Sequence, residues 1–456
     1  MPAYDAFLLV SFGGPESADD VLPFLENVTR GRGIPRQRLA EVAEHYYAAG
    51  GASPINQQCR DLISAVREDF GARGVKLPVY WGNRNWEPYL ADTVRAMKAE
   101  GVRRAIAFVT SAYSSYSSCR QYLDDIERAR AEAGPGAPRI DKLRRYFNHP
   151  GFIEPLAQNA DAAIATLPPG VRNDAHLVFT AHSIPAAMAA TSGPRFWPAG
   201  AQRLPETVPS RGDTPRTPDG PGPPMAPDPP QCLPGGTTLR APQDPPQGAL
   251  PGGTTLRAPQ DPPQGALPGG TTLRAPQDPP RGSQGPGGMY AAELTEAARL
   301  VTERVGDGGH PWRLVYQSRS GPQAQPWLGP DVCDYLEDLA RSGARAAVLV
   351  PVGFVSDHME VRHDLDVEAA QTAARLGLPI ARAATAGTHP RFVRMITELV
   401  RERLDGPVPD GPVPDDIGER AALGSLGPAS DACPAGCCEY ARPASGPAGR
   451  DTEART

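Results

Sequence analysis

Three carboxylates recur at four-residue intervals directly behind the longest apolar run of the chain. Glu360, Asp364 and Glu368 follow residues 346–355, whose pattern predicts a strand followed by a helix. Residues four apart are neighbours on one helix face, so the three acids would line up as a path for a cation. Like charges at this spacing repel one another by about 0.2–0.5 kcal/mol per pair, so a solvated helix face is the alternative interpretation.

His182 could partner such a carboxylate. It stands just behind residues 176–180, which read as a buried strand, and Pro185 would hold the turn that follows. An imidazole at the carboxyl end of a strand can transfer a proton or bind a metal. A hydrogen-bonded structural histidine is the alternative.

Cationic and hydroxyl side chains in two further segments could bind an anion. Arg30 and Arg32 lie in the glycine-spaced segment 24–35, and guanidinium groups bind carboxylates or phosphates with two parallel hydrogen bonds. Ser53 and the hydroxyl-rich residues 113–118 could add donors. Ordinary turn chemistry is the alternative for these hydroxyl groups.

A cysteine cluster marks the end of the chain. Cys433, Cys437 and Cys438 place three thiols within six residues. Neighbouring cysteines do not pair easily with each other, so we expect them to share a metal, held as a zinc site or an iron–sulfur cluster. A fourth ligand would come from elsewhere, and Cys59 and Cys333 are candidates.

Composition excludes several classes of protein. The net charge of −6 and the pI near 5.8 argue against a nucleic-acid-binding protein. The start of the chain lacks the pattern of a secretory signal, and the longest apolar run is half of the roughly 20 residues that a membrane helix needs. We therefore expect a cytoplasmic protein without a membrane span.

Part of the chain reads as low-complexity sequence. Glycine (48 residues) and proline (54) make up an unusually large share, and a proline-rich unit that starts at Pro234 recurs from Pro251 and Pro268. Each unit carries one leucine and could not build the core of a solenoid, so residues 195–288 are predicted to be a disordered insertion. Residues 406–456 are predicted to be a loose tail that carries the cysteine cluster.

The remaining residues alternate between apolar strands and amphipathic helices. The pattern predicts strands over residues 6–10, 78–81, 104–110, 176–180, 314–317, 346–352 and 379–383. This alternation indicates an α/β fold with parallel sheets, in which ligands bind at the carboxyl ends of the strands. We expect two halves, residues 1–150 and residues 151–194 with 289–405, and a deep cleft between them.

As a set, these segments resemble the ferrochelatases, and within that family the actinobacterial type that acts on coproporphyrin III. The matching segments are SFGGPE, GGASPIN, YWGNRNWEPYL, TSAYSSYSSC, FTAHSIP, VYQSRSGPQAQPWLGPD and PVGFVSDHMEVRHDLDVE. The resemblance implies two Rossmann-like halves that hold a porphyrin and insert Fe(II) into it. It implies that His182 and Glu360 act on the proton and the iron, and that Asp364 and Glu368 line the approach of the metal.

The resemblance also implies the binding residues. The side chains expected at the porphyrin are Phe12, Arg30, Arg32, Ser53, Tyr113, Ser114 and Tyr122. The two arginines would suit the four carboxylates of coproporphyrin III. Phe12 replaces a tyrosine that ligates iron in related Gram-positive enzymes, and Arg362 with His363 replaces a more apolar pair. His363 could join the site or be a surface variant.

The resemblance to the ferrochelatases also implies a cofactor for the cysteines. Similar ferrochelatases hold a 2Fe-2S cluster with three C-terminal cysteines and an internal one, which implies Cys119 beside Cys433, Cys437 and Cys438. The alternatives are a protoporphyrin IX ferrochelatase, a non-catalytic haem or iron–sulfur sensing module, and a chelatase for cobalt or nickel. We expect a monomer that makes at most transient contacts with neighbouring enzymes of the haem pathway.

Overall fold

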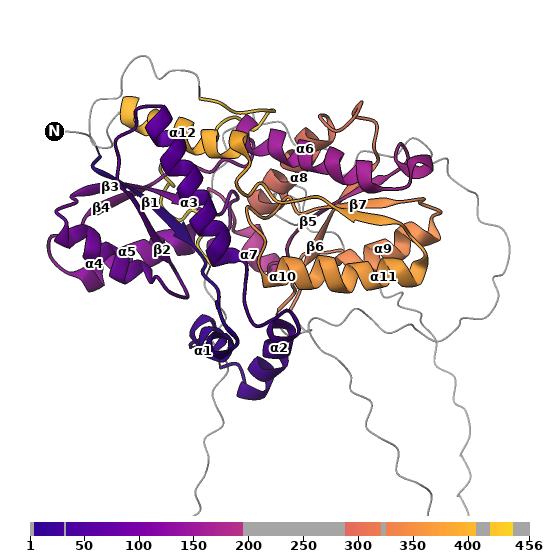
Figure 1. Ribbon diagram of the computed structural model, residues 1–456, viewed down its shortest axis with the longest axis horizontal. Helices are drawn as coiled ribbons and strands as arrows, with labels where there is room; N and C mark the ends of the chain where they lie inside the picture. Colours follow the sequence, from indigo (N-terminus) through magenta and orange to yellow (C-terminus); the bar gives the residue numbers. More distant parts are fainter. Residues whose placement is uncertain (1–3, 32, 195–287, 321–324, 407–419, 441–456) are drawn as a thin grey trace, which may run out of the picture.

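Two parallel sheets of four strands each lie side by side in the computed structural model (Figure 1). The structure describes residues 4–31, 33–194, 288–320, 325–406 and 420–440. Arg32, the predicted insertion up to residue 287 and most of the predicted tail therefore lie outside the described residues. The α/β class with parallel sheets is confirmed.

The two sheets share one strand order. The first runs β2-β1-β3-β4 and the second β6-β5-β7-β8. The strands are β1 (Ala6–Ser11), β2 (Val79–Asn83), β3 (Arg104–Val109), β4 (Arg139–Lys142), β5 (His176–His182), β6 (Trp312–Gln317), β7 (Ala347–Val350) and β8 (Ile380–Arg382). Seven of these strands match the predicted segments. The sequence reasoning missed β4, an edge strand whose polar sequence RIDK carries no apolar run.

Helices connect the strands and cover both sheets. Among the described residues, the α-helices are α1 (Ala18–Val28), α2 (Arg36–Ala48), α3 (Ile55–Ala72), α4 (Leu90–Ala99), α5 (Gln121–Ala133), α6 (Pro150–Thr166), α7 (Ala186–Ala190), α8 (Gly288–Thr302), α9 (Val332–Arg341), α10 (Met359–Val361), α11 (Ala370–Leu376) and α12 (Pro390–Asp405). Two π-helices, η1 (Tyr116–Arg120) and η3 (Arg362–Ala369), and the 3₁₀-helix η2 (Pro169–Val171) complete the list.

Alternating strand residues divide the interior into layers. Successive side chains of a strand point to opposite faces, so Leu8 of β1 packs with α4 and α5, whereas Phe7 packs with α3 in a different cluster. In the second sheet, Val178 of β5 packs with α9, and Phe179 packs on the other face. The cluster that holds Phe7 and Phe179 contains residues of both sheets, so one apolar core joins the two halves.

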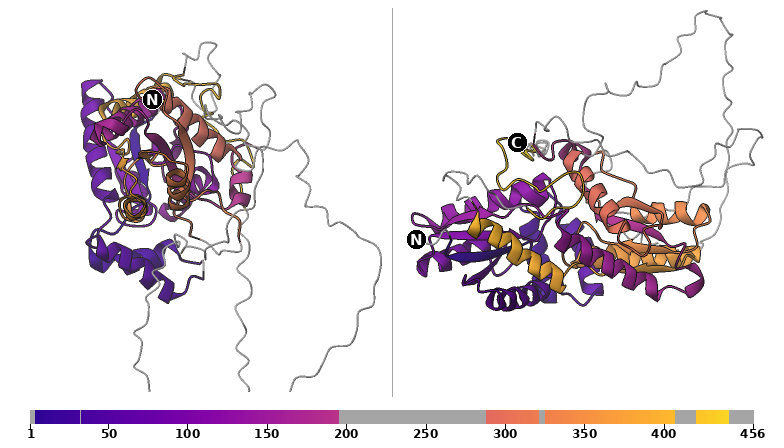
Figure 2. Two further views of the ribbon diagram at one scale, coloured as in Figure 1. Left: turned by 90° about the vertical axis from the view of Figure 1, so that its right-hand side faces the viewer. Right: turned by 90° about the horizontal axis from the view of Figure 1, so that it is seen from above.

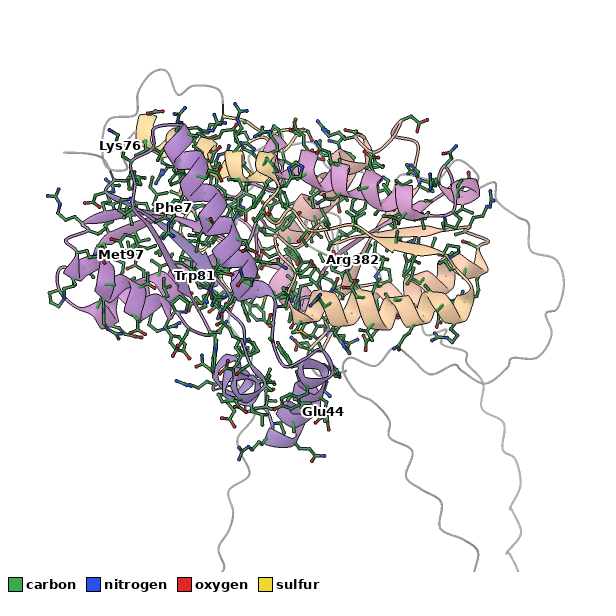
Figure 3. All side chains as sticks on the ribbon, in the orientation of Figure 1. Phe7, Glu44, Lys76, Trp81, Met97 and Arg382 are labelled. Atoms are coloured by element: carbon green, nitrogen blue, oxygen red, sulfur yellow. The ribbon has the colours of Figure 1, made fainter. Side chains whose placement is uncertain are left out.

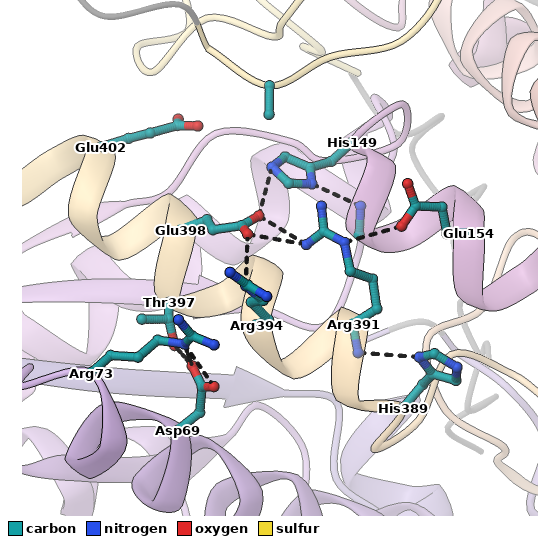
Figure 4. Close-up of polar contacts among 12 residues, drawn as sticks. Asp69, Arg73, His149, Glu154, His389, Arg391, Arg394, Thr397, Glu398 and Glu402 are labelled. Atoms are coloured by element: carbon teal, nitrogen blue, oxygen red, sulfur yellow. Dashed lines mark hydrogen bonds and ion pairs between the residues drawn. The ribbon is translucent and has the colours of Figure 1, made fainter.

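Helix α12 is the joint between the halves. It packs against α3 of the first half and α6 of the second. Thr397 donates a hydrogen bond to Asp69 of α3, while the Arg391 guanidinium lies 3.0 Å from Glu154 of α6 (Figure 4). Helix α12 therefore fixes the position of one sheet relative to the other, although the two sheets come from different parts of the sequence.

Helices α1 and α2 form a small unit that stands away from the sheets, and we call residues 18–48 the lip (Figure 2). Its buried side chains, among them Phe24 and Leu39, form a cluster separate from the main core. Figure 3 shows Glu44 on the lip, well apart from Phe7 and Arg382 in the two halves. Of the helices that the structure describes, none has the length and apolar character to cross a membrane.

Candidate active site

His182 ends β5 with one nitrogen of its ring beside a carboxylate. Its Nδ1 contacts the carbonyl oxygen of Ser183. A carbonyl only accepts hydrogen bonds, so Nδ1 carries a proton, and whenever the ring is neutral the lone pair is on Nε2. Nε2 lies 3.5 Å from Oε2 of Glu360. The pair is therefore arranged for Nε2 to take up a proton or bind a cation beside a negative charge.

The loop that presents Glu360 is held in place from three sides. A side chain at Gly353 would place its Cβ 2.6 Å from Ala181, so only glycine allows this loop to lie against β5. The backbone of Asp357 donates to Gln58, and the Asp357 carboxylate pairs with Arg382 at 3.0 Å. These contacts fix the start of α10, where Glu360 extends from the first turn with its side chain about half exposed.

His358 is a third group at this site. It was not among the predicted site residues, although it lies in the matching segment PVGFVSDHMEVRHDLDVE. Its Nδ1 lies 3.9 Å from Oε2 of Glu360, and its ring packs edge-on against Phe354. Burial lowers the pKa of His358, and Glu360 opposes that effect. The Glu360 carboxylate thus lies between two imidazole rings.

The three acids lie on one continuous helix whose middle is a π-helix. The chain runs from α10 through η3 to α11 without a break, and Asp364 and Glu368 both lie in η3. A π-helix has a wider turn than an α-helix, and such segments occur frequently at functional sites. Burial raises the pKa of Asp364 to about 7, although a hydrogen bond from Ser318 lowers it. The sequence spacing predicted the shared face but gave no signal for the π-helix.

His363 links the outer end of this acid series to the lip. Its Nε2 lies 3.4 Å from Glu368, and its ring stacks on that of His45 in α2 with centroids 3.9 Å apart. The hydrogen bond to Glu368 raises the pKa of His363, while burial and the neighbouring ring lower that of His45. The sequence left open whether His363 joins the site or is a surface variant. The structure places it beside Glu368, at the outer end of the acid series.

Phe12 and Arg30 both belong to the first half of the chain. Phe12 lies at the carboxyl edge of its sheet, and Arg30 lies on the lip. Phe12 follows β1 with 37% of its surface exposed, and its ring contacts Phe24 of the lip edge-on. Arg30 follows α1 and is exposed. Tyr46 of α2 lies close enough to Glu360 for that carboxylate to raise its pKa, in addition to the larger effect of burial. Tyr46 was missed because a tyrosine in an amphipathic helix carries no signal of its own.

Four of the residues predicted to bind the porphyrin are buried, and each has a polar partner inside the protein. The Tyr113 hydroxyl donates to the carbonyl of Val352 at 2.8 Å, and the Ser114 hydroxyl donates to Glu293 at 2.8 Å. Tyr122 lies beneath the Arg84 guanidinium, and Ser53 is 7% exposed. Their contact with a porphyrin stays a prediction, and so does the cleft between the halves.

The cysteines predicted to share a cofactor gather at η1. Cys119 of η1 and Cys437 both hydrogen-bond to Cys433, and the sulfur atoms of Cys437 and Cys438 are 3.8 Å apart. The backbone N–H of Gly193 donates to the sulfur of Cys438 at 3.1 Å. The alternative fourth ligands lie elsewhere, Cys59 in α3 and Cys333 in α9.

The charges around these thiols favour a thiolate. Hydrogen bonds from Cys119 and Cys437, together with the cations Lys142 and Arg145, hold the pKa of Cys433 well below its usual range. In the part of the chain that the structure describes, however, no group of three or more His, Cys, Asp or Glu side chains is arranged to hold a metal ion. The structure thus groups four sulfur atoms without defining a metal site.

Comparisons with known proteins agree on one family. The ferrochelatase family model matches residues 4–212 and 267–404. A coproporphyrin III ferrochelatase of Streptomyces griseus is 44% identical over 98% of this chain and 97% of that protein. One of Frankia alni is also 44% identical, over 96% of this chain and 87% of that protein. A ferrochelatase of Rhodopirellula baltica is 41% identical over 96% of this chain and 95% of that protein.

Proposed function

This chain belongs to the ferrochelatase family, and we propose that it inserts Fe(II) into coproporphyrin III to give coproheme. The observation that carries the proposal is the pair of His182 and Glu360, in which Nε2 lies 3.5 Å from the carboxylate while Nδ1 contacts the Ser183 carbonyl. Relatives that cover nearly the whole chain and bear the coproporphyrin name support the choice of substrate.

The reaction needs two pyrrole N–H protons to leave as the metal enters. With Nδ1 fixed as a donor to Ser183, His182 can accept one proton at Nε2 or bind the incoming iron there. The Glu360 carboxylate would stabilise the imidazolium that results, or contribute an oxygen ligand to the iron. Phe12 cannot ligate iron, so metal handling in this chain is assigned to His182 and Glu360.

Substrate recognition is assigned to the lip. Arg30 is an exposed cation there, and Arg32, two residues on, lies outside the described residues. Both would meet carboxylates that coproporphyrin III has and protoporphyrin IX lacks, since the former carries four and the latter two.

We further propose that the protein acts as a cytoplasmic monomer and meets neighbouring haem-pathway enzymes only transiently.

Anaerobic metal insertion tests this function. Purified protein receives Fe(II) with coproporphyrin III or protoporphyrin IX, and the absorbance change is followed. We expect turnover with a strong preference for coproporphyrin III. A preference for protoporphyrin IX would overturn the substrate, and tight porphyrin binding without metallation would indicate a non-catalytic haem-binding protein.

We also propose that Cys119, Cys433, Cys437 and Cys438 hold a 2Fe-2S cluster. The four cysteines fit this cofactor because cysteine sulfur is its usual ligand, because each sulfur contacts the next in the series Cys119, Cys433, Cys437 and Cys438, and because Lys142 and Arg145 offset the negative charge of a thiolate–iron centre. When bound, such a cluster supplies a one-electron redox centre. Among the described residues these thiols carry no disulfide, which leaves them free to bind.

Cys433→Ser tests the cluster separately from catalysis. Protein isolated without oxygen should contain about two iron and two sulfide per chain, and the variant should lose both together with the visible absorbance. Cys333→Ser, which changes a buried thiol in α9, is the matched control and should keep both. Zinc in place of iron and sulfide would replace this assignment with a zinc site.

A further inference from the structure

Tyr290 is a buried phenol beside the active site, and none of the roles assigned above uses it. It lies in the first turn of α8 and is 5% exposed. Its hydroxyl donates to the backbone carbonyl of His182 at 2.9 Å. The peptide that joins His182 to Ser183 is therefore held at both ends, because its N–H donates to the carbonyl of Gln317 at 2.7 Å. The imidazole extends from this backbone, so the orientation of the peptide decides where the ring points.

Tyr113 holds the segment that leads to Glu360 in the same way. Its hydroxyl donates to the carbonyl of Val352 at 2.8 Å. The next residue, Gly353, donates its N–H to the carbonyl of Thr180 in β5 at 3.0 Å. Tyr113 follows β3 of the first half and is 2% exposed. A phenol of one half thus fixes the loop that presents a carboxylate in the other half.

The two phenols contact each other, and α8 holds both of them. Their rings meet edge-on with centroids 6.4 Å apart. Glu293, which follows Tyr290 by three residues on the same helix face, is fully buried. Its carboxylate accepts from the Ser114 backbone N–H at 2.6 Å and from the Ser114 hydroxyl at 2.8 Å, and Arg145 balances its charge at 3.1 Å. Because Ser114 adjoins Tyr113, one helix fixes the position of both phenols.

We propose that Tyr113 and Tyr290 are positioning residues that hold the two catalytic segments, residues 180–183 and 352–360, at one separation. This inference rests on the proposed function, since it concerns the residue pair that carries that function. With the peptide after His182 fixed, the Ser183 carbonyl stays at Nδ1 of the imidazole. Nε2 then stays 3.5 Å from the carboxylate of Glu360, whose segment Tyr113 holds.

The choice of tyrosine at both positions fits this role. A buried tyrosine supplies an apolar ring for packing and a hydroxyl that needs a partner. Phenylalanine would fill the same space but would leave a buried backbone carbonyl without its donor. In both cases that carbonyl belongs to a catalytic segment, so the hydroxyl acts on the reacting groups through the backbone.

Tyr290→Phe tests the inference, because it removes one hydroxyl and keeps the ring. We expect kcat to fall about tenfold, since the imidazole is misplaced, while the KM for coproporphyrin III stays unchanged. Tyr146→Phe is the matched control. The Tyr146 hydroxyl donates to the carbonyl of Val109 at 3.0 Å in the first sheet, and Tyr146 is 1% exposed. This control should lose as much thermal stability as Tyr290→Phe and keep its kcat.

The tautomer of His182 gives a readout besides turnover. Nitrogen-15 NMR of the protein without substrates distinguishes a ring protonated at Nδ1 from one protonated at Nε2. At a pH where the ring is neutral, the signals that His182→Ala removes should be those of the Nδ1–H form, because the Ser183 carbonyl accepts there. In Tyr290→Phe the released peptide should let the Nε2–H form appear, whereas Tyr146→Phe should keep the wild-type signals.

Tyr113→Phe separates positioning from the porphyrin contact that the sequence predicted for this residue. Positioning lowers kcat and leaves the KM for coproporphyrin III unchanged. The double variant with Tyr290→Phe should be little slower than either single variant, because one displacement already separates the pair. A raised KM with an unchanged kcat would instead assign Tyr113 to the porphyrin and overturn its positioning role.

The outcomes distinguish this inference from the function beneath it. Wild-type kcat and an unchanged tautomer in Tyr290→Phe would overturn the inference. Equal losses of kcat in Tyr290→Phe and Tyr146→Phe would also overturn it, because a general weakening of the core would then explain both. A wild-type protein that inserts no metal would overturn the proposed function, and the NMR comparison would still decide whether Tyr290 orients His182.

Discussion

The two sheets have the same strand order but use their carboxyl edges differently. At the edge of the first sheet, the Asn83 amide donates to Asn56 and to the carbonyl of Glu87, and the Arg84 guanidinium pairs with Asp125 in the interior. At the edge of the second sheet, Nε2 of His182 faces the half-exposed Glu360 carboxylate at 3.5 Å, and Oε1 of Gln317 has no hydrogen-bond partner within the described part of the chain. The first edge is internally satisfied, whereas the second retains capacity to bind and transfer.

The difference shows that topology alone does not create an active site. Both edges lie at carboxyl strand ends, where ligands bind in such folds. Only the edge whose polar groups are left partly unpaired can exchange a proton or a metal ion. The first half contributes through the lip instead, which brings His45 and Tyr46 against the acids of the second half.

The largest expected effect comes from His182→Ala. Loss of Nε2 removes the only bare imidazole nitrogen assigned to the reaction, and turnover should fall by about 10³-fold. Coproporphyrin III should still bind within a few-fold of its normal affinity, because binding is assigned to the other half. Insertion rates and quenching of porphyrin fluorescence measure the two quantities on the same protein.

His176→Gln is the matched control for that variant. His176 begins the strand that His182 ends, and its Nε2 contacts the Tyr335 hydroxyl at 2.9 Å at the opposite edge of the sheet. It should retain normal turnover. If both variants were equally impaired, the contrast between strand ends would fail, and a general weakening of β5 would explain the loss.

A smaller effect is expected from Arg30→Ala in the lip. If the first half only binds, this change raises the KM for coproporphyrin III about tenfold, the loss of one charge-assisted contact, and leaves kcat unchanged. Arg36→Ala, which removes an arginine of the same lip that is 82% exposed, should have little effect. A fall in kcat with an unchanged KM would give the lip a part in the chemistry.

The sequence predicted much of the fold because its strongest signals are apolar runs. Residues 104–110 and 176–180 read as strands and are buried in β3 and β5. The edge strand β4 was missed because its pattern is polar. Neither η1 nor η3 was anticipated, since a π-helix depends on how a helix is packed and has no residue signature of its own.

The site was predictable where spacing within one segment carries the information. The series from Glu360 to Glu368 falls on one helix, as its four-residue interval predicted. Contacts between distant segments could not be foreseen in this way. The stacking of His45 on His363 joins residues more than three hundred positions apart, and the bond from the Tyr113 hydroxyl to the Val352 carbonyl joins the two halves in the same way.

The smallest effect should arise at the joint between the halves, where His149 lies beside α12 (Figure 4). Its Nδ1 accepts from the backbone N–H of Gly151, so Nε2 carries the proton and lies 3.7 Å from Glu398. Burial, then Arg144 and Arg391, lowers the pKa of His149 to about 3. The unfolded chain therefore binds a proton at higher pH than the folded one, and stability is lost as pH falls from about 6.5 toward 3. His149→Asn keeps a capping acceptor without that proton, so between pH 7 and 5 it should lose about 2 kcal/mol less stability than the wild type in denaturant titrations. Equal losses in both proteins would show that His149 is not held neutral, and that the joint does not contribute to acid sensitivity through this ring.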